Sequence, residues 1–387
     1  MKKRMKLIVI LTFFVPLFIL LICFHGNKDE KVKKPASSPK TTKISREEQK
    51  KEKVIKTIIS RMTLEEKVGQ LFFAKVPCNN QLEDIKTYHL GGYILFTNDY
   101  QGLDLAGVKS LTSSFQEVSK IPMIIGSDEE GGTVTRISSI LETPFESPLS
   151  LYQGGGIDAI VSDSESKARL LKSVGIQTGL CPVADIASND KSFIYDRTIG
   201  QNSEITSEYI SKVVSVFKKE QFGSTLKHFP GYGDNGDSHT SIIKDNRSLS
   251  DLQKIDFLPF EAGIRAGADS VLVSHNILTQ IDDVPSSISA KINGILRKEL
   301  GFKGVIMTDD LDMAGLSDFV NQDEAAYRVL TAGNDLIMGS SYQIQVPYLL
   351  GKVASGELTE KRIDQSVNRV LSWKYDLGLL ADFNNKQ

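Results

Sequence analysis

Cysteine, tryptophan and histidine are scarce in this sequence. Its 387 residues include three cysteines, one tryptophan and five histidines. Only Cys78 and Cys181 follow the N-terminal apolar segment, and two cysteines are too few to build a disulfide framework in a domain of this size. Because both lie in or beside apolar runs, we expect buried free thiols at these positions.

Signatures of nucleotide and metal chemistry are missing as well. The sequence contains no Walker A loop, and no pair of histidines stands at the H-x-x-x-H spacing of compact metal sites. We therefore predict a protein that uses neither a metal ion nor an organic cofactor.

Positive charge is scarce outside the N-terminal region. Residues 1–53 carry 14 Lys and Arg against 5 Asp and Glu, whereas the remaining residues carry 32 against 43, a net charge of −11. Because nucleic-acid-binding domains present basic surfaces, we expect no nucleic-acid partner. A composition of 40% hydrophobic and 24% charged residues is that of a globular protein, which excludes a disordered or polytopic membrane chain.

One uncharged apolar run, residues 7–24, follows a basic N-terminus. Its length is nearer the ~17–25 residues of a membrane-spanning helix than the ~7–15 of a secretory signal core. We interpret residues 1–24 as an uncleaved membrane anchor, with a lipoprotein acylated at Cys23 and a cleaved signal as alternatives. Residues 25–52 are rich in Lys, Pro and Ser and read as a flexible linker. The basic flank places residues 53–387 outside the cytoplasm, in the cell envelope.

Eight short apolar runs recur beyond residue 53. They span residues 70–76, 91–97, 122–128, 178–185, 223–229, 269–275, 304–310 and 334–340. Continuous rather than alternating apolar runs are typical of parallel strands that are buried on both faces. Stretches such as 203–221 and 249–266 separate them and space their apolar residues at three and four, as amphipathic helices do. The pattern predicts one α/β domain, residues 53–387, folded as a single (β/α)8 TIM-type barrel.

Chemically active side chains stand where these runs end. They are Asp128, Asp185, Lys227, His228, His275, Asp309 and Asp310. In a TIM barrel the reacting groups lie at the carboxyl ends of the strands and in the loops that follow. We therefore expect these side chains to meet at one end of the barrel.

Two segments concentrate this chemistry. In residues 226–241 the carboxylate of Asp237 can accept a hydrogen bond from His239 and orient its imidazole, which suits a general acid that later acts as a base. An Asx turn with an exposed histidine is the alternative. In residues 301–315 an apolar run leads into Asp309, which can act as a nucleophile, and Asp310, which can cap the following helix. Capping by both carboxylates, or metal binding, are the alternatives there.

Six motifs resemble glycoside hydrolase family 3. They are MTLEEKVGQLFF (62–73), GGYILF (91–96), DEEGGTVTR (128–136), DRTIG (196–200), KHFPGYGDNGDSH (227–239) and GFKGVIMTDDLDM (301–313). The D-S-H element is similar to that of the family's bacterial β-N-acetylglucosaminidase branch. The resemblance covers roughly residues 53–380 with the motifs in the family order.

The resemblance implies a role for each matching residue. Asp309 corresponds to the nucleophile, His239 to the general acid/base and Asp237 to its partner in a dyad. The residues implied to hold the sugar in the terminal subsite are Asp128, Arg136, Arg197, Lys227 and His228. One departure is Tyr232, which stands where the family usually has histidine in P-G-H-G, at a position expected near the leaving group. The others are Thr133 in place of a basic residue, and residues 240–243 in place of an L-P pair.

The implied activity is that of a retaining exo-β-N-acetylglucosaminidase, a type of β-N-acetylhexosaminidase. It would remove terminal β-N-acetylglucosamine from glycans derived from the cell wall through a covalent glycosyl-enzyme intermediate. β-Glucosidase or phosphorylase activity on the same scaffold, and a non-catalytic wall-glycan-binding protein, are the alternatives. Family glucosidases usually lack the D-S-H element, which argues against β-glucosidase activity. A monomer is expected, although the sequence leaves the oligomeric state open.

Overall fold

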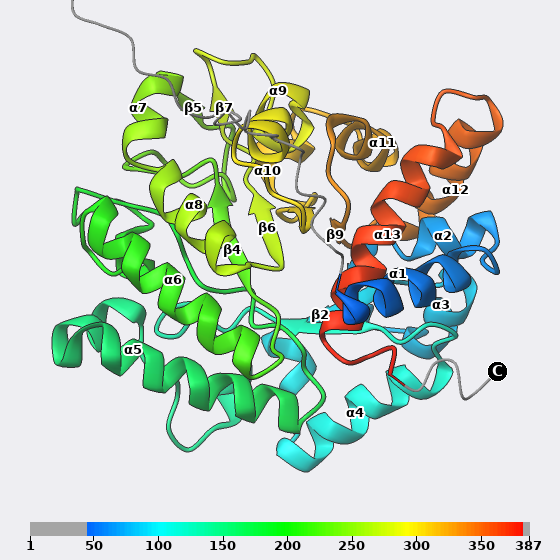
Figure 1. The fold of residues 1–387 in the computed structure, drawn as a ribbon, viewed down its shortest axis with the longest axis horizontal. Coiled ribbons are helices and arrows are strands. Elements are labelled where there is room, and N and C mark those ends of the chain that lie inside the picture. Colours follow the sequence, from blue (N-terminus) through cyan, green and yellow to red (C-terminus); the bar gives the residue numbers. More distant parts are fainter. Residues whose placement is uncertain (1–44, 382–387) are drawn as a thin grey trace, which may run out of the picture. The chain divides into compact units, whose positions relative to one another are not determined.

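The computed structural model describes residues 45–381 (Figure 1). The predicted anchor, residues 1–24, and the linker up to residue 44 lie outside the described residues. Among residues 45–381 none of the helices combines the length and hydropathy that a membrane crossing needs. The linker was predicted to run to residue 52, but helix α1 (Arg46–Ile59) already begins at Arg46. A capping box explains the difference: the Ser45 hydroxyl accepts from Glu48 N at 3.1 Å, and the Glu48 carboxylate accepts from Ser45 N at 2.9 Å.

The described chain alternates short strands with helices. The strands are β1 (Phe72–Lys75), β2 (Gly92–Leu95), β3 (Ile124–Ser127), β4 (Thr225–Phe229), β5 (Lys244–Asp245), β6 (Ser270–Val273), β7 (Ile277–Leu278), β8 (Val305–Thr308) and β9 (Ile337–Gly339). The further helices are α2 (Leu64–Gly69), α3 (Gln81–Tyr88), α4 (Leu105–Val118), α5 (Pro148–Ser173), α6 (Ser203–Lys219), α7 (Leu249–Lys254), α8 (Phe257–Ala266), α9 (Ala290–Gly294), α10 (Ala314–Ser317), α11 (Gln322–Ala332), α12 (Tyr342–Ala354) and α13 (Glu360–Asp376).

All strand pairs in the structure are parallel. One sheet has the order β3-β2-β1-β9, a second has the order β4-β6-β8, and β5 pairs with β7 in a small third sheet. Single parallel bridges link the two larger sheets: Met307 bridges to Leu336 on one side, and Thr178 bridges to Gly126 and Gly223 on the other. This α/β fold with parallel sheets is consistent with a TIM-like domain. Figure 1 shows the helices arranged around the strands.

The fourth predicted strand, residues 178–185, does not form. This segment contributes only the isolated bridges at Thr178 and Val183. Leu180 has a left-handed backbone with φ of 47°, and Pro182 has no N–H to donate to a neighbouring strand. The other seven runs each contain a strand, and the two-residue strands β5 and β7 lie outside the predicted runs.

Of the two stretches predicted as helices, one forms a single helix and the other is divided. α6 buries Thr206, Tyr209, Ile210, Val213, Val214 and Phe217. The predicted helix over 249–266 is instead two helices, α7 and α8, because Pro259 cannot donate the backbone hydrogen bond that would continue a helix across residue 255. α8 lies so close to its neighbours that a Cβ on Gly263 would meet Leu226 and Ile210 at 2.6 Å and 2.9 Å.

The two larger of the three hydrophobic clusters in residues 45–381 pack the strands and helices together. Strand residues including Phe73, Ile94, Leu272 and Met307 form one cluster, to which α13 adds Val370 and Trp373. A larger cluster joins the strands to the surrounding helices. Of the two cysteines in this unit, Cys181 is a buried free thiol as predicted, but Cys78 is exposed because the strand β1 ends before it.

Candidate active site

Asp309 follows the carboxyl end of β8 and is 6% exposed. Its backbone N–H donates to Val273 O on β6 at 2.9 Å, which fixes the main chain at this point. The carboxylate oxygen Oδ1 accepts from Asp310 N at 2.9 Å, whereas Oδ2 has no hydrogen-bond partner among the described residues. One carboxylate oxygen therefore remains available for a ligand.

The electrostatic surroundings keep Asp309 ionised. Burial alone would raise the pKa of this carboxyl group, but His228, His275 and His239 together with the Asp310 N–H outweigh it and hold the pKa below its ordinary value. The hydrogen bond from Gly315 N to Ser238 O holds the loop that carries His239 against α10, the helix that follows Asp309 in the chain. An ionised carboxylate with a free oxygen has the properties of a nucleophile.

Asp237 and His239 form the predicted pair. His239 Nδ1 lies 2.6 Å from Asp237 Oδ1, and the same oxygen accepts from His239 N at 2.9 Å. The side chains remain 33% and 48% exposed, respectively. The carboxylate thus orients the imidazole and leaves Nε2 accessible, as a general acid/base requires.

Ser238, between these two exposed residues, is fully buried. Its hydroxyl lies 2.5 Å from the Tyr232 hydroxyl, and its carbonyl accepts from Gly315 N of α10 at 2.9 Å. Glycine is required at position 315, since a Cβ there would stand 2.9 Å from Ser238 O and 3.1 Å from His275 Cβ. Tyr232, expected near the leaving group, is instead buried with its hydroxyl on Ser238, because its ring packs edge-on against Phe193 and His228.

Lys227 lies in β4 at the centre of an ion-pair network. Its Nζ is 2.6 Å from Asp128 Oδ1 and 2.5 Å from Glu130 Oε1, and the residue is 2% exposed. Burial lowers the pKa of Lys227, but Asp128 and Glu130 raise it by more, so the ammonium group stays charged. The network therefore holds a cation and two carboxylates in fixed positions beside the strand ends.

Arg197 completes this network from a short 3₁₀ turn (Tyr195–Arg197). Its guanidinium donates to both Glu130 oxygens at 2.9 Å and 2.7 Å, and Nη2 lies 3.0 Å from His228 Nε2. The other ring nitrogen of His228 lies 2.7 Å from Asp185 Oδ2, and Asp185 Oδ1 accepts from Tyr232 N at 2.7 Å. Asp185 therefore connects a predicted sugar-binding histidine to the residue that holds Ser238.

Arg136 approaches from the loop after β3. Its Nη2 lies 3.3 Å from Asp128 Oδ2, and the guanidinium lies over the Phe96 ring at 5.4 Å. Arg136 Nε is buried and has no hydrogen-bond partner among the described residues. Buried Glu129 shapes this loop by accepting from Arg136 N at 2.7 Å and Ile137 N at 2.9 Å.

Most of the predicted site residues thus contact one another, and the structure adds further residues to the site. Glu130, Tyr232 and Ser238 were not assigned roles from the sequence, although all three lie inside the quoted motifs. Asp310 does not cap a helix as expected; its carboxylate lies 2.5 Å from Lys75 Nζ, and α10 begins only after Met313. Within residues 45–381 the side chains gather no cluster of three or more histidine, cysteine or acidic residues that could hold a metal ion.

Comparisons with known proteins agree with this geometry. A family model described as "Glycosyl hydrolase family 3 N terminal domain" matches residues 63–373. The chain is 28% identical over 329 residues to "Beta-hexosaminidase A" of Pseudoalteromonas piscicida, covering 76% of this chain and 55% of that protein. It is 32% identical over 257 residues to a "Beta-hexosaminidase" of Neisseria meningitidis serogroup C, covering 64% of this chain and 71% of that protein.

A solved structure shows the same likeness. The glycoside hydrolase family 3 β-N-acetylglucosaminidase from Paenibacillus sp. str. FPU-7 superposes with a TM-score of 0.77 at 30% identity, over 82% of this chain and 63% of that one. The chain thus spans only a little over half the length of some relatives. The family match extends over most of the chain and includes the segments that carry Asp309 and His239, and the protein belongs to glycoside hydrolase family 3.

Proposed function

We propose that this protein is a retaining exo-β-N-acetylglucosaminidase. The observation that carries the proposal is the buried Asp309 carboxylate with its unpaired Oδ2, together with the hydrogen bond from Gly315 N, six residues further along the chain, to Ser238 O between Asp237 and His239. The names of the family relatives, β-hexosaminidase and β-N-acetylglucosaminidase, support the same class of substrate.

The reaction follows in two displacements. In the first, protonated His239 donates its proton to the glycosidic oxygen as the bond from that oxygen to C1 breaks, and Asp309 Oδ2 bonds to C1. In the second, neutral His239 takes a proton from water, the water oxygen bonds to C1, and the ester bond to Asp309 breaks. Two inversions at C1 give overall retention of the β configuration.

The ion-pair network gives the sugar its polar contacts. Asp128 has carboxylate oxygens that can accept from sugar hydroxyls, and Arg136 has a buried Nε that lacks a partner among the described residues. Lys227 lies beside Asp128 and Glu130 and has three N–H groups to share with them and with a sugar, and Asp185 and Arg197 fix the ring of His228 next to it. These contacts suit one terminal sugar with an acetamido group.

The first experiment tests the nucleophile. Asp309→Ala should abolish the release of p-nitrophenol from its β-N-acetylglucosaminide, with the urea-unfolding midpoint near that of the native chain. Added azide should restore part of the release and yield the α-glycosyl azide, because azide enters on the face that the carboxylate has vacated. Near-normal turnover by the variant would remove Asp309 from this role, and a β-azide would contradict retention.

The second experiment tests the substrate and the rival activities. The native chain should act on p-nitrophenyl β-N-acetylglucosaminide and on muropeptides from digested peptidoglycan, and should prefer the former to the β-glucoside. Free N-acetylglucosamine should be the product with and without phosphate. A sugar 1-phosphate would identify a phosphorylase, and a preference for the glucoside would identify a glucosidase. Glycan binding without turnover would identify a non-catalytic protein.

We also propose that the enzyme works outside the cytoplasm as a monomer attached through its N-terminal segment. The basic start and apolar run of residues 1–24 support this location, and wall glycans would be available there. Protease added to intact cells should degrade the protein, whereas protection until the cells are lysed would contradict the location.

A further inference from the structure

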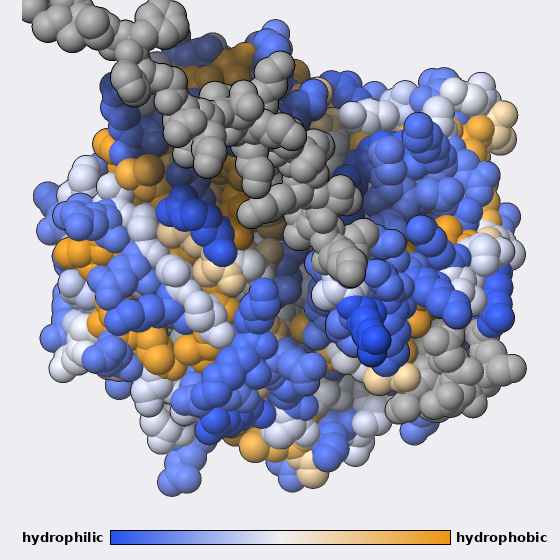
Figure 2. Space-filling view, in the orientation of Figure 1, coloured by the Kyte–Doolittle hydropathy of each residue, from blue (hydrophilic) through white to orange (hydrophobic). Residues whose placement is uncertain are grey.

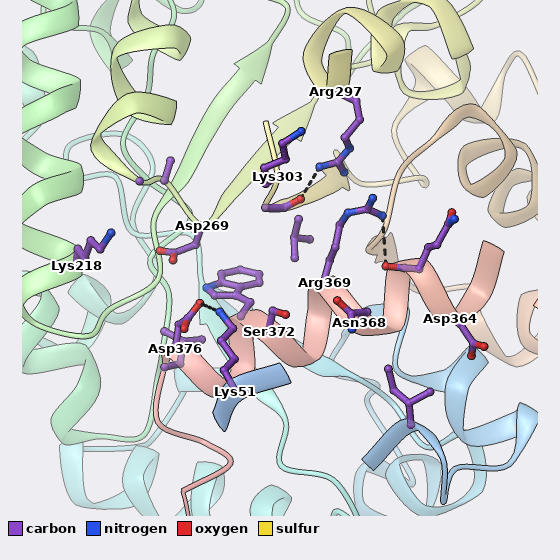
Figure 3. A pocket seen from close by; sticks show the side chains of 18 of the residues that line it. Lys51, Lys218, Asp269, Arg297, Lys303, Asp364, Asn368, Arg369, Ser372 and Asp376 are labelled. Atoms are coloured by element: carbon purple, nitrogen blue, oxygen red, sulfur yellow. Dashed lines mark hydrogen bonds and ion pairs between the residues drawn. The ribbon is translucent and has the colours of Figure 1, made fainter. Parts of the chain in front are cut away.

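A second site lies at the opposite ends of the strands from Asp309. A cavity of about 1370 Å³ is lined by Phe222, Asp269 and Gly304, which precede β4, β6 and β8 (Figure 3). Asp309 follows β8 at its other end, and a strand of four residues spans ~13 Å. A ligand in this cavity, the basal pocket, would therefore not touch the proposed catalytic groups.

One face of α13 forms a wall of the basal pocket. Lys361, Gln365, Asn368, Arg369 and Ser372 all line the cavity, and their spacing of three and four residues places them on the same side of the helix. In Figure 3 Arg369 rises from α13 toward Arg297 and Lys303, which approach from the β8 side. The pocket thus presents amide, hydroxyl and cationic donors from more than one direction.

The acidic groups of the pocket already have ion-pair or hydrogen-bond partners. Asp376 pairs with Lys51, and Asp364 Oδ1 lies 2.9 Å from Lys67 Nζ. Asp269 accepts from Ser224 N at 2.9 Å, and burial raises the pKa of its carboxyl group. Two of the three carboxylates are therefore already paired with lysines, Asp376 with Lys51 and Asp364 with Lys67.

Several cations of the pocket lack such partners. Lys298, Lys303 and Lys361 are exposed and form no ion pair with any residue in the described range 45–381. Positive charge therefore exceeds negative charge in this pocket, although residues 54–387 as a whole carry a net charge of −11. On the face drawn in Figure 2, hydrophilic side chains predominate over α1 and α13, which border the pocket.

An arginine cluster beneath the pocket adds to this excess. The buried carboxylate of Asp335 lies 2.6 Å from Arg297, 2.9 Å from Arg369 and 3.8 Å from Arg362. Three guanidinium groups thus share one carboxylate. Burial, together with repulsion from the other arginines, lowers the pKa of Arg362 and lowers that of Arg297 to about 10. An additional anion near Arg369 would relieve this repulsion.

From this arrangement we propose that the basal pocket binds an extended anion that carries several phosphate groups. Arg369 offers a planar fork and the three lysines offer mobile point charges, which are the two donor types that bind phosphate in proteins. The cavity volume exceeds that of one phosphate many times, so a chain of phosphates fits it better than a single ion. The site is concave, which favours a soluble chain over a flat bilayer surface.

Calorimetric titration of the full chain with inorganic tripolyphosphate at low salt tests the proposal. Replacing three pocket lysines together (Lys298→Gln, Lys303→Gln, Lys361→Gln) should weaken binding about tenfold. A matched control changes three exposed lysines elsewhere (Lys86→Gln, Lys109→Gln, Lys254→Gln), which alters the net charge equally and should leave binding near native. Both triple variants should retain native hydrolysis of the aryl glycoside, which reports correct folding.

Each of the remaining outcomes would overturn the proposal. Absence of saturable binding by the native chain would show that the pocket does not hold phosphate chains. Equal weakening of tripolyphosphate binding in the two triple variants would show that binding depends only on the overall charge of the protein. Binding to phosphatidylglycerol vesicles without binding to tripolyphosphate would assign the lysines to a membrane surface instead.

Discussion

The hydrogen bond between Tyr232 and Ser238 should control the position of the acid/base. Both residues are 0% exposed, and their hydroxyl oxygens are 2.5 Å apart. Tyr232→Phe removes one partner and leaves a buried serine hydroxyl unpaired, which costs about 1–3 kcal/mol. Since the flanking residues are already partly exposed, the loop can avoid this cost by moving Ser238 into water, and His239 would move with it.

The expected loss of activity follows from the free-energy cost of the unpaired serine hydroxyl. If 1–3 kcal/mol favours the displaced loop, kcat/KM falls by about 5- to 150-fold for substrates whose leaving group needs protonation. Release of p-nitrophenol should fall much less, because this leaving group departs without an acid. The free energy of unfolding should fall by no more than this 1–3 kcal/mol, because the displaced serine hydroxyl forms its hydrogen bond with water.

A double-mutant cycle makes the test decisive. Ser238→Ala combined with Tyr232→Phe removes both polar groups, so neither is left unpaired, and the double variant should be more active than Tyr232→Phe alone. Tyr93→Phe is the matched control: this tyrosine is also buried, and its hydroxyl donates to Gln81 O at 2.9 Å. Equal losses on both substrates, or additive effects in the cycle, would refute the positioning role.

Three further variants extend the test to other parts of the site. His239→Ala should slow the hydrolysis of substrates with poor leaving groups far more than that of activated aryl glycosides, as compared by kcat/KM. Glu130→Gln should lower the free energy of unfolding in urea by about 3–5 kcal/mol, because it removes the carboxylate that Arg197 binds and leaves Asp128 as the one anion beside the two buried cations. Burial raises the pKa of Asp310 to about 6, so its contribution to stability is full below about pH 4 and is lost as the pH rises through 6. Asp310→Asn should therefore gain stability relative to the native chain, by up to about 3 kcal/mol, between pH 4 and pH 7 in thermal unfolding.

Each of these expectations has an outcome that contradicts it. An equal loss on both substrate types would exclude His239 as the acid. A near-native urea midpoint for Glu130→Gln would mean that water or movement compensates the two cations. A stability difference for Asp310→Asn that does not change with pH would show that this carboxyl group titrates normally in the folded chain.

The strand positions and the nucleophile were predictable because they follow from local pattern. A continuous apolar run indicates a buried parallel strand, and parallel strands bring their carboxyl ends to one end of the fold. The positions of Asp309, Lys227 and His228 at the strand ends therefore follow from the sequence alone. The exception, residues 178–185, failed because hydrophobicity does not report the missing N–H of Pro182.

The partners of these residues were not predictable, since they are distant in the sequence. Glu130 binds Lys227 from 97 positions away and Arg197 from 67 positions away, and no periodicity relates such segments. Tyr232 was noticed only as a departure from a motif, and its burial could not be inferred from its neighbours in the chain. The basal pocket likewise depends on helices and strand starts that only the folded chain brings together.

The site combines fixed and adjustable parts in one hydrogen-bonded chain. Asp185 binds His228 through one carboxylate oxygen and Tyr232 through the other, and Tyr232 in turn holds Ser238 between the two dyad residues. The members of this chain are buried, whereas Asp237 and His239 at its end are exposed. A sugar that displaces His228 would therefore act on Ser238 through three buried hydrogen bonds, and we expect occupation of the subsite to affect the position of the acid/base. A shift of His239 in a crystal structure with N-acetylglucosamine in the subsite would support this coupling, and an unchanged His239 would contradict it.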